Sequence, residues 1–224
     1  DGGNNDLPFL RPDVHICLVD PHRPGHETLY YPGTANLRMA DFVVIPKEET
    51  ADPGHIRQVK AAVQQVNPQA VIIDAAAPLR VSDPALIAGK RVLVIEDGPT
   101  LTHGGMTYGA GTLAAERWGA AELVDPRPYA CGSIAAVLET YPTLQRLLPA
   151  MGYSAYQMAD LEATINTTPC DTVIFGTPVD LRRLLTLHVP AVRVSYDIKE
   201  IGEPTLEALV PCLAQRTRAQ HCEP

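Results

Sequence analysis

The sequence lacks the cysteine patterns that mark zinc sites and disulfide frameworks. Its five cysteines stand far apart and no two form a CxxC pair: Cys17, Cys131, Cys170, Cys212 and Cys222. Scattered thiols of this kind are typical of proteins in the reducing cytoplasm, which is the location we expect. No apolar run approaches the ~18 residues that a membrane-spanning helix needs, and no signal peptide is visible.

An excess of basic residues is also missing. The 18 Lys and Arg against 26 Asp and Glu give a formal net charge of −8, which argues against a nucleic acid or a membrane surface as partner. A local anion site stays compatible with this balance, because basic residues can gather in a few loops. With 46% hydrophobic residues among 224, the chain can bury a core in one large or two small domains. It begins without Met inside a polar motif, so we expect the gene product to extend further upstream.

Apolar runs alternate with helical patterns along the chain. This alternation predicts an α/β fold, a mostly parallel sheet flanked by helices. We expect strands over residues 14–19, 42–45, 70–73, 91–95, 121–124, 172–175 and 191–196, and helices over 52–66, 110–118, 134–141, 155–166 and 204–216. Residues 78–90 read as a connector rich in Pro and Gly, and 148–153 as a turn. The expected organisation is one domain over residues 1–80, a second over 90–216 and a tail over 217–224.

The stretch around which the chain is organised is residues 96–111. A strand runs into Glu96 and Asp97, a loop with His103, Gly104 and Gly105 follows, and a helix comes next. Strand, Gly-rich loop and helix together place ligands at the carboxyl edge of a parallel sheet, and glycines let backbone N–H groups converge on an anion. A long surface turn is the alternative reading.

Other strands end in polar motifs of the same type. Asp20-Pro-His-Arg, Asp125-Pro-Arg and Gly176-Thr-Pro follow apolar runs, and Asp1-Gly-Gly reads as the loop after a strand further upstream. These motifs should therefore converge at one sheet edge. Arg23, Arg127 and Arg182 can grip phosphate or carboxylate, and Thr177 would lie where a helix begins. The arginines can instead pair with nearby carboxylates. His22 and His26 favour hydrogen bonds or phosphate contacts over metal binding, and a rigid solvated loop is the third option.

These motifs together resemble cyclic 2,3-diphosphoglycerate synthetase and its GTPase-like relatives. The resemblance covers nearly the whole chain and is carried by residues 1–9, 20–27, 30–33, 36–41, 96–106, 125–129, 148–153 and 176–183. It implies a P-loop protein of the signal-recognition-particle class that uses ATP to close 2,3-diphosphoglycerate into a cyclic anhydride. No G-x-x-x-x-G-K-[ST] motif occurs, so the chain resembles the C-terminal part of such a protein and should not turn over ATP or GTP alone. Pro46-Lys47-Glu48-Glu49 departs from the family's Asn-Lys-x-Asp base motif, which puts guanine specificity in doubt.

The resemblance also implies roles for individual residues. The catalytic candidates are Asp1, which would hold Mg²⁺, and Glu96 and Asp97, which would bind metal or orient a phosphate. Lys47 and Glu49 would border the base of ATP or GTP. The candidates for binding substrate phosphates are His22, Arg23, His26, His103, Gly104, Gly105, Arg127, Thr177 and Arg182. The expected partner is a small phosphorylated acid such as 2,3-diphosphoglycerate, and a homodimer is compatible with the pattern. Two other functions stay open: a GTPase-like regulator or metallochaperone, and a non-catalytic fragment that binds anions or dimerises.

Overall fold

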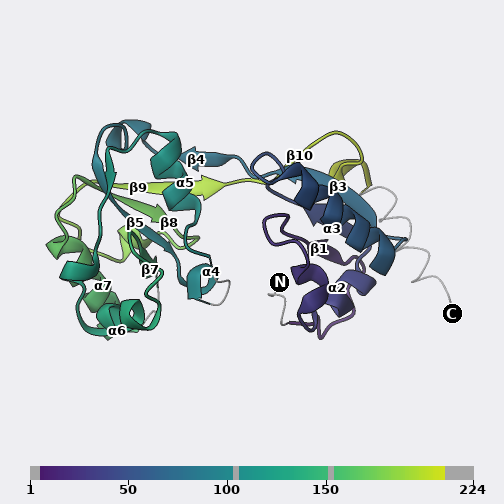
Figure 1. Ribbon diagram of the computed structural model, residues 1–224, viewed down its shortest axis with the longest axis horizontal. Helices are drawn as coiled ribbons and strands as arrows, with labels where there is room; N and C mark the ends of the chain where they lie inside the picture. The colour runs from purple at the N-terminus through teal and green to yellow at the C-terminus, as the bar shows by residue number, and fades with distance from the viewer. Residues whose placement is uncertain (1–5, 103–105, 151–153, 210–224) are drawn as a thin grey trace. The chain divides into compact units, whose positions relative to one another are not determined.

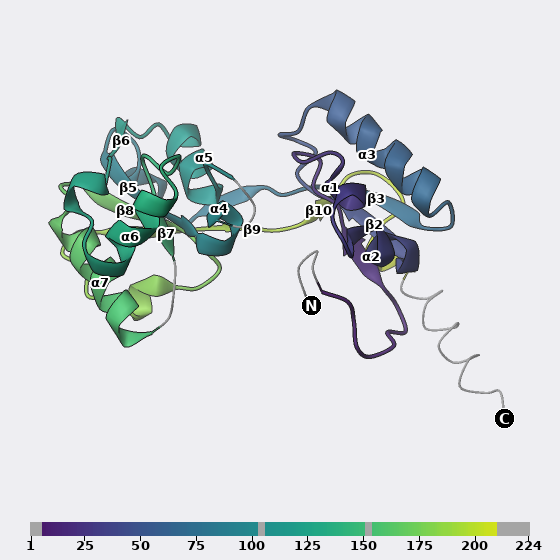
Figure 2. The same cartoon turned by 60° about the horizontal axis from the view of Figure 1, so that its bottom comes forward.

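The computed structural model divides the chain into two compact units. It describes residues 6–102, 106–150 and 154–209. The first unit runs to Pro78 and resumes at Asp197, and the second unit spans Leu79–Tyr196 (Figures 1 and 2). The second unit is therefore an insertion in the chain of the first, and each is described by itself below.

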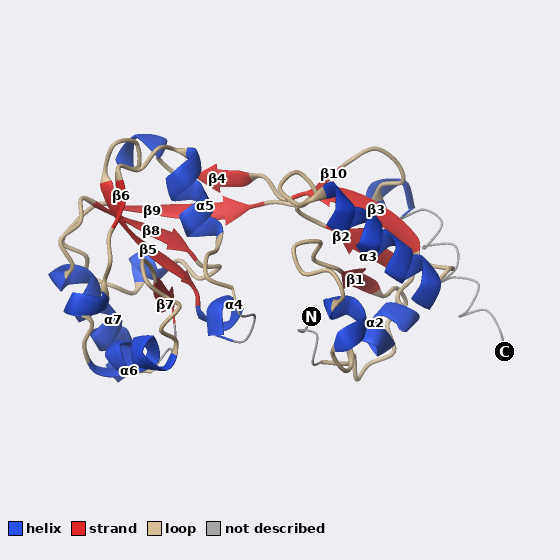
Figure 3. Cartoon of the chain, in the orientation of Figure 1, coloured by secondary structure: helices blue, strands red, loops and turns tan. Residues whose placement is uncertain are grey.

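The first unit is built on a sheet with the strand order β1-β2-β3-β10. Its strands are β1 (Ile16–Leu18), β2 (Phe42–Ile45), β3 (Val71–Ala76) and β10 (Lys199–Glu200), and its helices are α1 (His26–Leu29), α2 (Gly33–Met39) and α3 (Pro53–Val66) (Figure 3). The first three strands are parallel, whereas β10 runs antiparallel to β3. The carboxyl ends of β1, β2 and β3 therefore lie along one edge, where parallel sheets bind ligands.

The core of the first unit follows from the alternation of side chains along β2, which is buried along its whole length. Val43 and Ile45 pack with apolar residues of α2 and α3, whereas Phe42 and Val44 pack on the other face with Leu206 and Leu209. The helix α3 begins as the sequence predicts, with Pro53 in its first turn and the Asp52 carboxylate accepting the Gly54 N–H at 2.6 Å.

A single amide side chain joins two helix ends in this unit. Asn67, at the end of α3, is buried and its Nδ2 donates to the carbonyl oxygens of Leu37 at 3.0 Å and Ala40 at 2.8 Å. These carbonyls lie at the C-terminal end of α2, where helix carbonyls lack partners within the helix. Asn67 therefore fixes the loop that leads from α2 into β2.

The second unit contains a sheet with the order β4-β9-β8-β5-β6, and β7 pairs with the other half of β5. The strands are β4 (Leu79–Val81), β5 (Arg91–Asp97), β6 (Glu122–Leu123), β7 (Leu148–Ala150), β8 (Thr172–Gly176) and β9 (Ala191–Tyr196). The helices are α4 (Gly98–Thr102), α5 (Ala110–Arg117), α6 (Gly132–Thr140) and α7 (Ala155–Thr167), with 3-10 turns at Pro84–Leu86, Arg127–Tyr129 and Leu181–Arg183. All strand pairs are parallel except β4 with β9.

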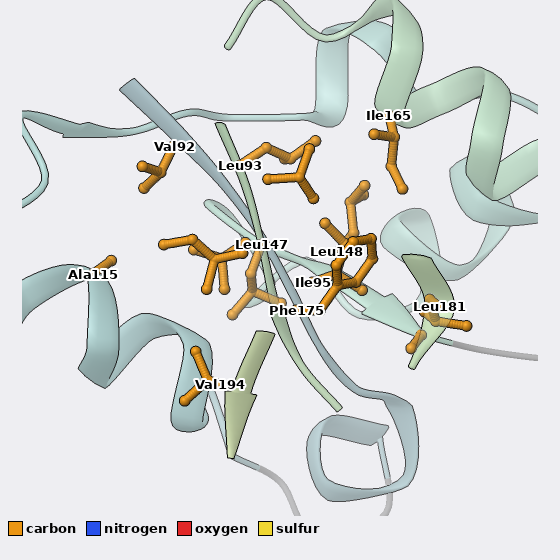
Figure 4. Close-up of a cluster of buried hydrophobic side chains, with 14 of the residues drawn as sticks. Val92, Leu93, Ile95, Ala115, Leu147, Leu148, Ile165, Phe175, Leu181 and Val194 are labelled. Atoms are coloured by element: carbon orange, nitrogen blue, oxygen red, sulfur yellow. The ribbon is translucent and has the colours of Figure 1, made fainter. Parts of the chain in front are cut away.

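The core of the second unit occupies both faces of this sheet. Ala115 of α5 and Val194 of β9 lie on one side, and Phe175, Leu181 and Ile165 lie on the other (Figure 4). Because β8 is buried at every position, it is the central strand, and the polar loop that follows it starts from a rigid support.

The predicted α/β class with mostly parallel, helix-flanked sheets is confirmed. Three short strands were not expected: residues 148–150 form β7 instead of a turn, the expected connector contains β4, and β10 follows the last expected strand. Each owes its strand geometry to a partner far away in sequence, which local patterns do not reveal. Among the described residues, no helix is long and apolar enough to cross a membrane.

Candidate functional site

A group of charged side chains surrounds Asp20, which follows β1 at the carboxyl edge of the first unit's sheet. The Asp20 carboxylate accepts hydrogen bonds from Lys47 Nζ at 2.8 Å, Arg23 at 3.3 Å and the His22 backbone N–H at 3.0 Å. Burial alone would raise the pKa of Asp20, but Lys47, the His22 N–H and Arg23 together lower it. Lys47 follows β2 in a left-handed backbone conformation with φ 64°, which is uncommon outside glycine. Two cations and one anion thus meet where β1 and β2 end.

The two histidines of this loop make different contacts. His22 Nε2 lies 2.9 Å from the Thr50 hydroxyl, in the loop after β2. The His26 ring lies edge-on to Tyr30, with centroids 4.7 Å apart. Beside them, the Glu27 carboxylate accepts the Gly25 N–H at 2.8 Å. Hydrogen bonding and ring packing are thus the roles the geometry gives these imidazoles. Within the described ranges, no three His, Cys, Asp or Glu residues are grouped so that they could hold a metal ion.

A second ionic group at this edge escaped the sequence analysis. Lys60 of α3 lies 2.6 Å from Asp74 of β3 and 3.4 Å from Glu48, which follows β2. Burial and the neighbouring Asp74 raise the pKa of Glu48 despite the nearby Lys60. Burial would lower the pKa of Lys60, but Asp74 and Glu48 raise it. The neighbouring candidate Glu49 accepts the Ala77 N–H at 2.9 Å and so links the loops after β2 and β3.

In the second unit, Glu96 is buried at the end of β5 with only 1% of its surface exposed. Its carboxylate accepts the backbone N–H groups of Gly109, Gly111 and Thr112 and the Thr112 hydroxyl, at 2.6–3.1 Å. These donors form the start of α5, where helix N–H groups lack partners and favour negative charge. Burial raises the pKa of Glu96 above its usual value, although the hydrogen bonds from Thr112, Gly111 and Gly109 oppose the shift.

Glycines make room for this carboxylate. A Cβ built on Gly109 would lie 2.5 Å from Glu96 Oε2, and one on Gly176 would lie 2.5 Å from the Gly111 nitrogen. The Gly-rich sequence after β5 therefore surrounds an internal carboxylate at this helix start. Asp97 ends β5 in register with Ala150, at the carboxyl edge of the sheet. The candidates His103, Gly104 and Gly105, and Asp1 in the other unit, lie outside the described residues.

Each candidate arginine is paired with an aspartate of its own loop. Arg127 binds Asp125 through Nε, at 2.9 Å to Oδ1 and 3.1 Å to Oδ2, and through a third bond at 2.5 Å. These contacts lower the pKa of Asp125. Arg127 also lines a shallow cavity of about 160 Å³ with Ala135, Leu138 and Glu139 of α6. Arg23 and Asp20 form the same kind of pair. In the structure these arginines therefore form ion pairs within their own loops, which was the alternative that the sequence left open.

The loop after β8 holds a third arginine–aspartate pair. Arg182 binds Asp180 with two parallel hydrogen bonds, from Nε at 2.8 Å and from the terminal nitrogen at 3.0 Å. The Thr177 side chain is buried and its hydroxyl accepts the Val179 N–H at 3.4 Å. Arg193 of β9 donates to the Pro178 carbonyl of this loop at 2.7 Å.

The expected convergence of the motifs at one sheet edge is wrong, because the strands that they follow belong to two sheets. Apart from His26 and Arg127, the described candidates form two sets, one in each unit. His22, Arg23, Lys47 and Glu49 share the carboxyl edge of β1–β3. Glu96, Asp97 and Thr177 lie at the carboxyl ends of β5 and β8, followed by Arg182. The additional residues Asp74 and Arg193 had one sequence signal: each is a charge inside an otherwise apolar strand.

The comparisons with known proteins add a relationship to this geometry. No protein-family model matches the chain. Over 210 residues, or 94% of its length, the chain is 56% identical to a protein of Thermococcus kodakarensis named arginine synthetase ArcE. The chain spans about half, 47%, of that protein. The relative's name refers to arginine, whereas the sequence motifs resemble those of cyclic 2,3-diphosphoglycerate synthetase. The name and the motifs differ in the product but agree that the chain is similar to a synthetase.

Proposed function

We propose that this chain is part of an ATP-dependent synthetase that forms arginine or a close analogue. The observation that carries the proposal is the identity of 56% over 94% of the chain with a protein that bears the name arginine synthetase. A synthetase couples the cleavage of a nucleoside triphosphate to the formation of a new bond. Such an enzyme needs a site for phosphates and for their counter-charges, and catalysis there is mostly positioning and charge neutralisation.

The carboxyl edge of the first unit is the proposed border of the nucleotide site. Lys47 uses one of its three N–H donors on Asp20 and keeps 42% of its side chain exposed, so it can donate to a nucleotide as well. Asp20 lies between Lys47 and Arg23 and holds both cations in place. Mg²⁺ is part of the proposal through Asp1, and Glu96 is proposed as a structural carboxylate that shapes the loop before α5.

Formation of cyclic 2,3-diphosphoglycerate is the second candidate. It is favoured by the long motifs that the chain shares with that family, among them residues 20–27 and 96–106. Both candidates consume ATP, and they differ in the acceptor. A GTPase-like regulator or metallochaperone is a third reading, and it would respond to a metal ion or a protein instead of either small molecule.

The experiment is a chimera in which this chain replaces the matching half of the Thermococcus relative. The first reaction is measured in reverse, as ATP formation from the nucleotide and phosphate products when arginine is present. The second is measured in the forward direction, as ATP consumption when 2,3-diphosphoglycerate is present. Arginine-dependent ATP formation supports the first candidate, and consumption that depends on 2,3-diphosphoglycerate supports the second. A chimera that is folded by circular dichroism and shows neither activity refutes both. This chain alone serves as the control, for which we expect no turnover of ATP or GTP.

A further inference from the structure

Three arginines surround one aspartate in the loop after β8. Besides the two hydrogen bonds from Arg182, Asp180 forms an ion pair with Arg183, whose Nε lies 3.5 Å from Oδ2. Arg193 acts on the same carboxylate from β9, and the pKa of Asp180 is lowered, chiefly by the hydrogen bonds from Arg182. Three positive charges against one negative charge leave this arginine cluster with a net charge of about +2 in a chain of net charge −8.

Arg193 has the feature that distinguishes this cluster from the other arginine–aspartate pairs. Its neighbours Val192 and Val194 are buried in the core, so strand alternation sends Arg193 to the opposite face of the sheet. One terminal nitrogen donates to the Pro178 carbonyl at 2.7 Å. The Nε atom is buried and makes no hydrogen bond within the part of the chain that the structure describes. Buried donors almost always meet an acceptor, so Arg193 keeps hydrogen-bonding capacity that the described residues do not use.

The cluster is held in position before any ligand arrives. Arg193 lies on a strand that pairs with the central strand β8. Its backbone N–H donates to the Ser82 hydroxyl at 3.2 Å, and its carbonyl oxygen accepts the Ser82 backbone N–H at 3.1 Å. In the loop after β8, the side chain of Leu181 is buried in the core, and this anchors its sequence neighbours Asp180 and Arg182. Because hydrogen bonds already hold the guanidinium groups of Arg182 and Arg193, little of their side-chain entropy is lost when a ligand binds.

We propose that Arg182, Arg183 and Arg193 form a binding site for the phosphate group of a small molecule, with Asp180 as the residue that positions Arg182. A phosphate dianion matches the net charge of the cluster, whereas a carboxylate carries one negative charge. The planar guanidinium fork bonds phosphate oxygens with two N–H groups at once. Arg183 contributes the most accessible donors, since 85% of its side chain is exposed. Only the source of the phosphate rests on the proposed function: it is either inorganic phosphate or a phosphorylated substrate.

Isothermal titration calorimetry on this chain tests the site with three probes: inorganic phosphate, 2,3-diphosphoglycerate and succinate. Arg193→Met should weaken phosphate binding about tenfold or more, because it removes charge-assisted hydrogen bonds. Arg193→Lys should recover only part of the loss, since a lysine keeps the charge without the fork. Arg183→Met, at an exposed position with no risk to folding, should weaken binding about threefold.

The matched control is Arg91→Met, which removes one positive charge from the same unit at the exposed ion pair with Glu122. It should leave the affinity unchanged within about twofold, because exposed ion pairs act over short distances at physiological salt. Tighter binding of 2,3-diphosphoglycerate than of inorganic phosphate assigns the site to a phosphorylated substrate, and the reverse order assigns it to phosphate itself. No phosphate binding, preference for succinate, or equal affinity in Arg193→Met, Arg183→Met and Arg91→Met overturns the proposal. Since these measurements need no turnover, they stand apart from the chimera experiment.

Discussion

Replacing the buried carboxylate of Glu96 should destabilise the second unit, and the change that isolates its charge is Glu96→Gln. Glutamine keeps the shape but turns one oxygen into an NH₂ group, which must face N–H donors of Gly109, Gly111 or Thr112. Leaving a buried N–H without an acceptor costs about 1–3 kcal/mol. Losing negative charge at a helix start costs about 0.3–2 kcal/mol more. We therefore expect the free energy of unfolding to fall by about 2–4 kcal/mol.

Urea unfolding measures this change, with Trp118 as the reporter. It is the one tryptophan of the chain, and it lies at the C-terminal cap of α5, the helix whose first turn Glu96 binds. Glu122→Gln is the matched control, since its carboxylate is exposed in an ion pair with Arg91, and it should change stability by less than about 0.5 kcal/mol. Equal stability of the two variants would show that Glu96 is not needed as a cap, and it would return to the list of catalytic candidates.

Three further predictions follow from described contacts. Gly176→Ala places a Cβ 2.5 Å from the Gly111 nitrogen and against Glu96, so we expect a loss of about 1–3 kcal/mol of stability by thermal unfolding; an unchanged melting temperature would contradict the close packing. Asn67→Ala removes the donor to the Leu37 and Ala40 carbonyls, and urea unfolding should show a loss of about 1–3 kcal/mol; a loss below about 0.5 kcal/mol would mean that water replaces the amide. Because the pKa of Asp20 is lower in the folded protein than in the unfolded chain, ionised Asp20 should stabilise the fold. This contribution is complete above the pKa of the unfolded chain, about 3.9, and is lost as the pH falls through the lower pKa of the folded protein. Asp20→Asn should flatten this part of the pH profile, and a variant with the same acid dependence as the parent would refute the assignment.

Much of the architecture was readable from the sequence because its strands carry strong local signals. The run from Val92 to Ile95 is apolar and mostly β-branched, and it lies in the strand β5 as expected. The N-cap at Asp52 was equally readable, since Asp followed by Pro satisfies the first N–H groups of a helix. The strands β4, β7 and β10 were missed because each has three residues or fewer and depends on a distant partner.

The site was harder to predict, because a loop sequence shows which groups are present and not which of them bind each other. Glu96 looked catalytic for its place beside glycines, yet those glycines bring the start of α5 to its carboxylate. Arg127 and Arg182 each bind the aspartate two residues before them, a pairing that the loop sequence allowed but did not single out. Arg193 was overlooked because a single charge in an apolar strand is a weak signal without knowledge of the neighbouring loop.

The antiparallel pairing of β4 with β9 has a consequence for how such a protein can be assembled. Leu79 and Tyr196, the first and last residues of the second unit, are register partners, so the two ends of this unit meet. In the first unit, Ala76 and Lys199 are register partners as well, so a short turn could close that chain where the insertion leaves it. Residues 79–196 therefore have the form of a cassette. A gene could gain, lose or exchange this segment while the chain ends of each unit stay close together, and we expect each unit to fold by itself.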